Sequence, residues 1–395
     1  MRAAVAEHAP ESWNVAPLRN LCTRITSGGT PSRRVPEYFG GDVPWVKTME
    51  LLDCWLDDSD EHLTEAGLAN SSAKLLPAHT VLMAMYGATV GQLGVLRRPM
   101  TCNQAACALI ADPTVADFRY VYYQLLHARP LLRSLANGAA QQNLSARTIA
   151  DFEIPVPSLS EQRAIADVLG ILDDKIDSNA RLAATVLELL PHEIIGVESA
   201  DWEEMSVSSL AEFVNGGAYT SNATGTGRMV VRIAELNTGP GPSTVYNDID
   251  VPDEKVARPG DILMAWSGSL GVHYWTRPEA VINQHIFKVI CSDYPSWFVF
   301  RRLQDAMPAF RQTAADKATT MGHIKRHHLE DSKVLVPPPQ VLRDLDRRLG
   351  PLWSRLLAAE SESLALVAMR DALIPELLSG RLRVPEAESI SKGSS

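Results

Sequence analysis

The chain has 395 residues, a net charge of −10 and 46% hydrophobic residues, which predicts two or three domains rather than one core. No apolar run reaches the roughly 20 residues that span a bilayer, which argues against a membrane-spanning protein. The five cysteines form no CxxC pair, so neither a zinc site nor a disulfide framework is supported. Because Glu7 and His8 stand where a signal peptide needs apolar residues, we expect a cytoplasmic protein.

The first part of the chain reads as strands followed by helices. Apolar or alternating runs predict strands at 43–48, 80–85, 92–96 and 106–110. Helical periodicity predicts a helix at 118–136. A longer helix follows, with Ser158 and Glu161 as a capping pair, and ends within 189–196 at a proline and a glycine.

The same succession then returns. Runs at 228–234 and 280–290 predict strands, 296–314 predicts a helix, and a second long helix ends within 373–380. These elements predict a mixed α/β (α+β) fold with two strand-rich domains.

Five short segments recur in the same order, which indicates that the chain is an internal duplication. They are "TSGGTP" (26–31) with "VNGGAY" (214–219), "PWVKTMEL" (44–51) with "MVVRIAEL" (229–236), "LMAMYGATVG" (82–91) with "LMAWSGSLG" (263–271), "CNQA" (102–105) with "INQH" (282–285), and "DFEIPVPSLSEQ" (151–162) with "DSKVLVPPPQVL" (331–342). Each match is weak alone, but their common order makes an accident improbable.

Both long helices carry apolar residues at the seven-residue spacing of a coiled coil, in the same phase. The expected helix-pairing residues are Ile165, Leu169, Leu172, Ile176, Asn179, Val186, Leu345, Leu349, Leu352, Leu356 and Leu366. One such stripe alone is equally typical of an ordinary core helix. Two in phase favour an antiparallel, pseudo-two-fold pair, about 55–60 Å long, that holds the domains apart. Asn179 is a polar residue within the stripe, and such residues can fix register.

The expected organisation is therefore two repeated domains, each followed by a helix. The predicted ranges are domain 1 at 13–157, spacer helix 1 at 158–200, domain 2 at 201–337, spacer helix 2 at 338–382 and a flexible tail at 383–395.

With its repeated "LMAMYGATVG" and the segment "NLSARTIADFEIPVPSLSEQRAIADVLGILDDKIDSN" (143–179), the chain resembles the DNA-specificity subunits of type I restriction–modification systems over nearly its whole length. The second copy departs from the pattern, since "SLSEQRAIADVL" becomes "PPQVLRDLDRRL" and loses the Glu-Gln pair. The resemblance implies two target-recognition domains that read a bipartite duplex DNA site. It also implies that the helices dock two methyltransferase subunits, which methylate adenine, and that restriction/translocase subunits join the complex.

The sequence favours a non-catalytic chain. It contains neither a phosphate-binding loop nor an amino-methyltransferase motif. A metal at the cluster of His323, His327, His328 and Asp331 is conceivable, but no distant ligand pair supports it. We therefore expect no cofactor on this chain, with S-adenosylmethionine, ATP and Mg²⁺ on the partner subunits.

Candidate DNA contacts are loop residues with cationic, hydroxyl, amide or aromatic side chains, because phosphates attract cations and adenine pairs with amides. They are Thr30, Ser32, Arg33, Arg34, Lys47, Tyr86, Gln141, Gln142, Asn143, Tyr219, Arg232, Trp266, Ser267, Lys317, Thr319, Thr320 and His323. For any one of them, a solvated loop position is an equally good interpretation. The amides of "NQ" at 103–104 and 283–284 are more typical of residues that satisfy neighbouring backbone groups.

Two other functions stay open from the residues alone. One is a fused restriction–modification enzyme, which the absence of catalytic motifs disfavours. The other is a methyltransferase scaffold or regulator that binds no DNA. The acidic net charge of −10 mildly supports the scaffold. The distribution of charge softens this argument, because the two domains are nearly neutral: residues 13–157 hold 12 Lys and Arg against 13 Asp and Glu, and residues 202–337 hold 13 against 15.

Overall fold

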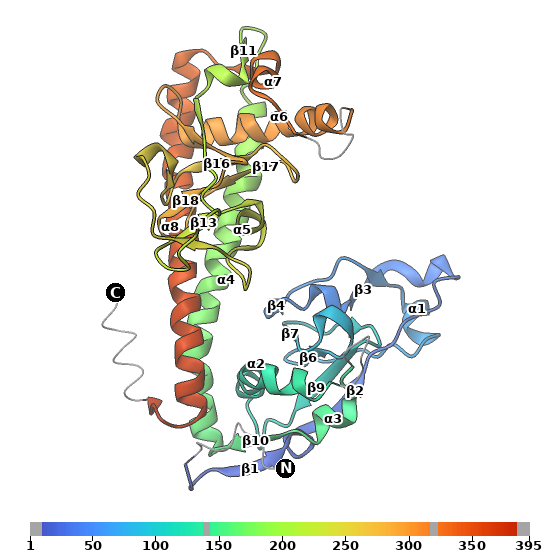
Figure 1. Ribbon diagram of the computed structural model, residues 1–395. Helices are drawn as coiled ribbons and strands as arrows, with labels where there is room; N and C mark the ends of the chain where they lie inside the picture. The colour runs from blue at the N-terminus through green and yellow to red at the C-terminus, as the bar shows by residue number, and fades with distance from the viewer. Residues whose placement is uncertain (1–9, 137–142, 317–322, 385–395) are drawn as a thin grey trace. The chain divides into compact units, whose positions relative to one another are not determined.

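The computed structural model describes residues 10–136, 143–316 and 323–384 (Figure 1). The chain divides into two compact units: unit 1 comprises Met1–Asp174 and Ala368–Ser395, and unit 2 comprises Lys175–Val367. Each unit therefore combines strands with parts of two long helices. The segment expected to be a tail lies almost wholly outside the described residues.

Unit 1 contains the first ten strands. They are β1 (Asn14–Pro17), β2 (Cys22–Ser27), β3 (Phe39–Val46), β4 (Cys54–Leu56), β5 (His62–Leu63), β6 (Val81–Ala84), β7 (Leu93–Leu96), β8 (Thr101–Cys102), β9 (Ala106–Ala111) and β10 (Glu153–Val156). Its helices are α1 (Glu65–Ala69), α2 (Phe118–Ser134), α3 (Ala146–Ala150), the start of α4 (Leu159–Ile195) and the end of α8 (Pro339–Leu378).

The described part of unit 2 contains ten further strands. They are β11 (Glu203–Ser206), β12 (Glu212–Asn215), β13 (Arg228–Val231), β14 (Tyr246–Asn247), β15 (Val256–Ala257), β16 (Ile262–Ala265), β17 (Gly271–Tyr274), β18 (Ala280–Ile282), β19 (Ile286–Ile290) and β20 (Lys333–Val336). Its helices are α5 (Ile233–Thr238), α6 (Ser296–Asp316), α7 (Arg326–Asp331), the remainder of α4 and most of α8.

The sheets repeat in the same way as the sequence. The strand order β2-β9-β6-β7 in unit 1, extended by β4, matches the order β12-β19-β16-β17 in unit 2. The parallel pair β3–β8 matches the parallel pair β13–β18, and the ribbon β1–β10 matches β11–β20. The internal duplication is therefore a duplication of topology.

The structure corrects one expected strand. The run 280–290 forms two strands, β18 and β19, which belong to different sheets. The chain changes sheets at Asn283, whose N–H donates to the carbonyl of Val231 at 3.1 Å, while Ile286 N–H turns back onto the carbonyl of Asn283. An uninterrupted apolar run cannot reveal such a crossing, because both strands are buried.

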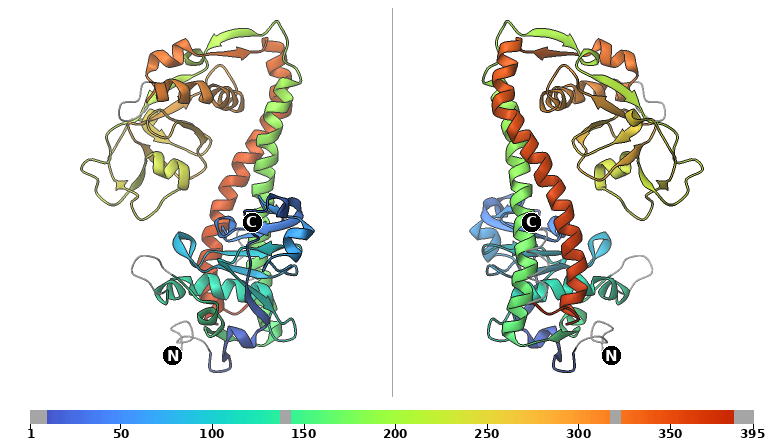
Figure 2. Two further views of the ribbon diagram at one scale, coloured as in Figure 1. Left: turned by 90° about the vertical axis from the view of Figure 1, so that its right-hand side faces the viewer. Right: turned by 90° about the vertical axis from the view of Figure 1, so that its left-hand side faces the viewer.

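Helices α4 and α8 pack against each other antiparallel, and Figures 1 and 2 show them side by side. In unit 2, Glu193 pairs with Arg348 at 2.6 Å and Asn179 hydrogen-bonds Glu362 at 2.9 Å, so numbers rise along one helix as they fall along the other. α4 begins where the capping pair predicts: Ser158 Oγ accepts from the N–H of Glu161 at 3.3 Å.

Most of the expected stripe is buried. The buried members are Ile165, Leu169, Leu172, Asn179, Val186, Leu345, Leu349 and Leu356, while Ile176 and Leu366 are partly exposed. Burial of each leucine contributes about 2 kcal/mol, so the stripe is a major part of the core of both units.

Leu352 differs from the expectation, because it is 37% exposed while Trp353 is 3% exposed. A straight helix drifts about 20° per heptad from a strict seven-residue pattern. At this position the indole of Trp353 packs on Tyr274 and Phe300, with ring centroids 5.5 and 5.1 Å away. The inward position is therefore one residue later than the heptad predicts.

Candidate nucleic-acid interface

The Gly-Gly turn of unit 1 packs tightly against the "NQ" turn. Gly28 N–H donates to Ala106 O at 3.2 Å, and Gly29 N–H donates to Cys102 O at 2.9 Å. A Cβ on Gly28 would lie 2.1 Å from the oxygen of Cys102, which no side chain can tolerate. This close approach explains why the first position must be glycine.

The turn of unit 2 repeats the arrangement. Gly216 N–H donates to Ile286 O and Gly217 N–H donates to Ile282 O, both at 3.0 Å. A Cβ on Gly216 would lie 2.2 Å from the oxygen of Asn283. In both units the Gly-Gly motif and the "NQ" motif therefore form one packed turn, held together by backbone hydrogen bonds.

A third segment joins this edge in both units. Tyr86 forms a β-bridge with Asn143, and Ser267 forms one with His323. The glycine that follows each of these loop residues has φ of +71° in unit 1 and +65° in unit 2. Three segments therefore lie together at one edge of each unit, which we call the recognition edge. In unit 1 they are the loop at Tyr86, the turn at 103–105 and Asn143; in unit 2 they are the loop at 266–267, the turn at 283–285 and His323.

Two unit 1 cations are held by a carboxylate that the sequence did not reveal. Glu61 accepts hydrogen bonds from Arg33 at 2.6 Å and from Lys47 at 2.9 Å. These two partners lower the pKa of Glu61 to about 2. Arg33 also lies over the rings of Phe39 and Trp45, 4.5 and 5.0 Å from their centroids, so it is anchored rather than freely extended.

Arg232 of unit 2 is held in the same manner. Its Nη2 binds Glu235 Oε1 at 2.6 Å and its Nε binds Glu235 Oε2 at 3.0 Å. Glu235 is 2% exposed, and the hydrogen bonds from Arg232 and Thr244 lower its pKa despite its burial. This bidentate pair first satisfies a buried carboxylate, and only part of the guanidinium remains for other contacts.

The recognition edge of unit 2 carries an aromatic cluster. The Nε1–H of Trp266 donates to Asn215 Oδ1 at 2.9 Å. The rings of His285 and His323 lie 5.6 and 6.5 Å from the indole, and both histidines are exposed. Sequence reasoning missed Asn215 and His285, although both lie inside or next to repeated motifs.

The two edges also differ at one hydrogen bond. Thr30 Oγ1 donates to Gln104 Oε1 in unit 1. At the equivalent place in unit 2, Ala218 replaces the threonine, and Gln284 Oε1 is buried with no partner among the described residues. The units therefore share a backbone but present different side chains.

The remaining candidates have varied surroundings. Ser32 and Arg34 are exposed, Tyr86 is 43% exposed, and Tyr219 packs against a small cluster of buried valines. Gln141, Gln142, Lys317, Thr319 and Thr320 lie outside the described residues. Asn143 and His323 are exposed at the recognition edges.

The described residues contain neither a candidate metal site nor a candidate membrane-spanning helix. No group of three His, Cys, Asp or Glu side chains among them could hold a metal, and within the suggested histidine cluster His328 instead caps α7 by accepting from Lys325 N–H at 2.9 Å. Burial raises the pKa of the Cys102 and Cys107 thiols to about 12, so they are unsuited to act as thiolates. No described helix is both long and apolar enough to cross a membrane.

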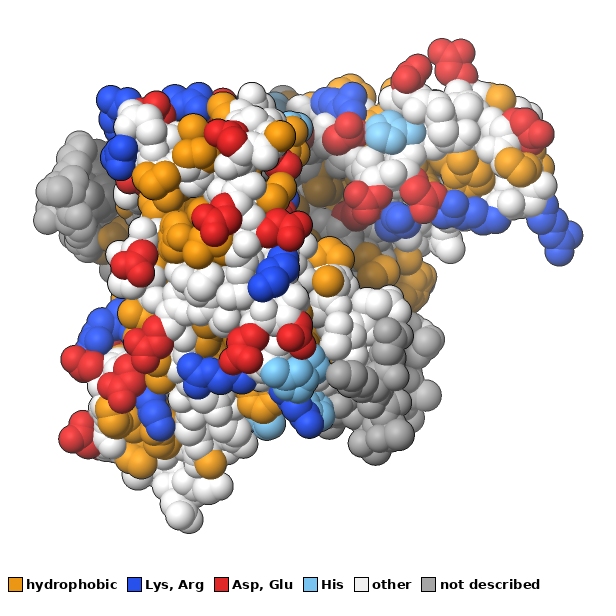
Figure 3. Space-filling view, turned by 90° about the horizontal axis from the view of Figure 1, so that it is seen from above, with side chains coloured by type: hydrophobic (Ala, Val, Ile, Leu, Met, Phe, Trp, Pro, Cys, Tyr) orange, Lys and Arg blue, Asp and Glu red, His pale blue; other side chains and the backbone are white. Residues whose placement is uncertain are grey.

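Surface charge is mixed rather than strongly basic. Figure 3 shows one face, on which Lys and Arg side chains alternate with Asp and Glu side chains. The exposed cations therefore do not form one continuous field on this face, in agreement with the negative net charge.

Two strand-rich units with matching recognition edges, joined through an antiparallel helix pair, define a duplicated recognition protein. The chain belongs to the type I restriction modification DNA specificity domain family, whose model matches residues 10–188 and 199–342. It is a specificity subunit of type I restriction–modification systems, the DNA-recognition component and not a catalytic subunit.

Individual relatives agree with this assignment. The specificity subunit of the type I restriction enzyme MjaIX from Methanocaldococcus jannaschii is 24% identical over 95% of each chain. The specificity subunit of EcoKI from Escherichia coli is 22% identical and covers 87% of this chain and 83% of its own. The crystal structure of a type I S subunit from M. genitalium has 17% identity and a TM-score of 0.62, covering 92% of this chain and 96% of its own, and shows that the fold is shared.

Proposed function

We propose that each unit reads one half of a bipartite duplex DNA site through its recognition edge. The proposed recognition domains are 13–157 and 201–337, with the spacer helices at 158–200 and 338–382. The observation that carries this proposal is the pair of matching edges, which share their backbone hydrogen bonds but differ in their side chains. A common scaffold with different side chains is what two readers of different sequences require.

The spacer helices dock two methyltransferase subunits in this proposal. These subunits methylate adenine with S-adenosylmethionine. The restriction/translocase subunits use ATP and Mg²⁺. The whole complex acts in the cytoplasm. The exposed side of α4 in unit 1 presents Asp167, Ile171 and Asp174, with Ile171 68% exposed. An exposed apolar side chain with an acidic border suits a protein interface better than DNA.

The assigned DNA contacts follow from the surroundings of each side chain. Five of the described candidates have exposed side chains or lie at a recognition edge, and we propose these as the DNA contacts: Arg34, Tyr86, Asn143, Ser267 and His323. Arg33, Lys47 and Arg232 have carboxylate partners, so we expect them to orient their loops and to make weaker phosphate contacts.

Methylation mapping tests the proposal. Genomic DNA from cells that express the chain with its methyltransferase subunit should carry methyladenine in one bipartite motif. Exchange of residues 13–157 for those of another family member should change one half of the motif only. A swap that altered both halves together would show that the units do not read independently.

A further inference from the structure

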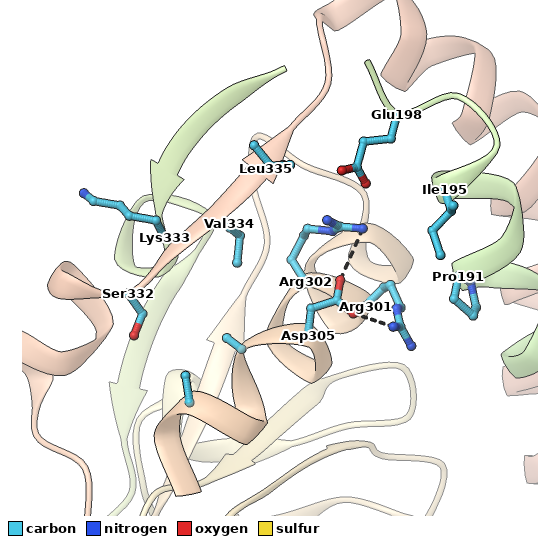
Figure 4. Close-up of a pocket in the computed structure, with 12 residues that line it drawn as sticks. Pro191, Ile195, Glu198, Arg301, Arg302, Asp305, Ser332, Lys333, Val334 and Leu335 are labelled. Carbon is cyan, nitrogen blue, oxygen red and sulfur yellow. Dashed lines mark hydrogen bonds and ion pairs between the residues drawn. The ribbon is translucent and has the colours of Figure 1, made fainter. Parts of the chain in front are cut away.

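A cavity of about 420 Å³ opens between α6, β20 and the end of α4, and its whole lining belongs to unit 2 (Figure 4). Its walls are partly apolar, with Pro191 and Ile195 on one side and Val334 and Leu335 on another. Ile195 is 66% exposed, so apolar surface continues from the cavity to the outside.

Two arginines on α6 share a single carboxylate inside this cavity. Arg302 Nη2 lies 3.2 Å from Asp305 Oδ2, and Arg301 binds the other oxygen of Asp305. The side chain of Arg302 is only 9% exposed. The Nε of both arginines is buried with no partner in the described part of the chain. Burial lowers the pKa of Arg302 in spite of Asp305, so this guanidinium is short of negative charge.

The arginine pair is particular to unit 2. Aligned on the prolines inside α2 and α6, the corresponding residues of unit 1 are Tyr123 and Gln124. Both have internal partners, since Tyr123 donates to Asp173 at 2.7 Å and Gln124 donates to the hydroxyl of Tyr120 at 2.7 Å. The duplicated core therefore does not require cations here.

The unsatisfied N–H groups indicate what would complete the cavity. Arg301 and Arg302 supply two positive charges and Asp305 and Glu198 two negative charges, while the exposed Lys333 extends away from them (Figure 4). One further carboxylate can accept from the guanidinium Nε–H groups that have no partner among the described residues. A duplex, with a charge about every 1.7 Å, would meet two carboxylates and a withdrawn Arg302.

We propose that this cavity receives one acidic side chain carried on an apolar segment of a protein partner. The inference rests on the proposed function, in which that partner is the methyltransferase subunit. The exposed Ile195 continues the apolar wall from the cavity onto the end of α4. A docked acid would therefore hold the partner against both the end of spacer helix α4 and helix α6 of the second recognition domain.

The first test measures binding of the purified methyltransferase subunit of the same system to the full chain. Arg302→Gln, which installs the unit 1 residue, should raise Kd roughly 10- to 100-fold, because loss of one partner of a buried charge pair weakens complexes strongly. The matched control is Arg258→Gln in unit 2, which lies outside the spacer helices and the recognition edge; its side chain is 41% exposed, and the change should leave Kd unchanged. Equal affinity of Arg302→Gln and wild type would overturn the proposal.

A DNA-binding measurement distinguishes the alternative occupant of the cavity, a DNA phosphate. If Arg302→Gln kept the affinity for the methyltransferase subunit but flattened the salt dependence of DNA binding, the cavity would serve a phosphate and the proposal would be wrong. Failure of the wild-type chain to bind the subunit would instead contradict the proposed function itself.

The wild-type complex provides a second test that does not depend on a folded variant. Carbodiimide adds to a carboxylate to form an O-acylisourea. The lysine amine attacks its acyl carbon, the carbodiimide leaves as a urea with one carboxylate oxygen, and the new amide bond joins the two chains. Lys333 borders the cavity but extends away from the arginine pair (Figure 4), so we expect its exposed Nζ to be joined to an Asp or Glu of the methyltransferase subunit that neighbours the docked acid. Recovery of other cross-links between the two chains without any at Lys333 would count against the site.

Discussion

Asn179 of α4 donates a hydrogen bond to Glu362 of α8 at 2.9 Å, inside the interface of the two long helices. Asn179 is 2% exposed, and Lys175 binds the same carboxylate oxygen at 3.0 Å. These hydrogen bonds lower the pKa of Glu362. A buried amide that is satisfied in one alignment only is a means of fixing helix register.

The first prediction concerns helix length. Insertion of four residues beside Asn179 should add about 6 Å of helix and lengthen the spacer between the half-sites while leaving both half-sequences unchanged. Methylation mapping of cells that express the variant measures both. New half-sequences at the old spacing would contradict the view that the helices set the distance.

A second prediction concerns the buried charge of Asp173, which binds Arg370 at 2.8 Å and accepts from Tyr123 at 2.7 Å. Asp173→Ala should lower the free energy of unfolding by about 3–5 kcal/mol, because it leaves a buried arginine unpaired. Tyr123→Phe should lower it by about 1 kcal/mol. Urea denaturation of the full chain checks both values, and equal effects would mean that the ion pair is not the stabilising element.

The third prediction concerns the pH dependence that Glu61 produces. Its pKa is lowered from 4.5 to about 2 in the folded chain, so its contribution to stability is complete above about pH 4.5 and is lost as the pH falls toward 2. Denaturation from pH 7 to pH 3 should therefore show a steeper acid loss for wild type than for Glu61→Gln. The exposed Glu65→Gln is the matched control and should follow the wild-type curve.

The same variant makes a fourth prediction about DNA. Glu61→Gln releases Arg33 and Lys47, so non-specific affinity should rise and the salt slope should steepen by about one unit. Arg34→Ala should flatten the slope by about one unit. Fluorescence anisotropy of the assembled complex at several salt concentrations measures these slopes. A slope that none of these changes alters would mean that this loop does not approach phosphates.

The fifth prediction concerns the readout by unit 2. His285→Ala should relax one or two positions of one half-site, because base contacts are worth about 1–3 kcal/mol each. The other half-site should stay unchanged. Ala105 occupies the equivalent place in unit 1, so Ala105→Ser should alter the opposite half-site only. Unaltered methylation motifs in both variants would remove these residues from the set of base readers.

The sequence by itself determined the duplication, the two long helices and several of the buried strands, among them β6, β7 and β9. It could do so because apolar periodicity reports which side of an element is buried, and because glycine is required wherever backbones come as close as Gly28 and Cys102 do. The order of the repeats was enough to indicate which loops of the two units correspond.

Only the tertiary structure decided which charges are available. Arg33, Lys47 and Arg232 look like free cations in the sequence, but Glu61 and Glu235 hold them. Glu61 belongs to no recognisable sequence motif. Its partners Arg33 and Lys47 lie 28 and 14 residues away along the chain, so no local pattern predicts the contacts. The inward position of Trp353 and the cavity around Arg302 depend in the same way on contacts between distant segments, which no local pattern encodes.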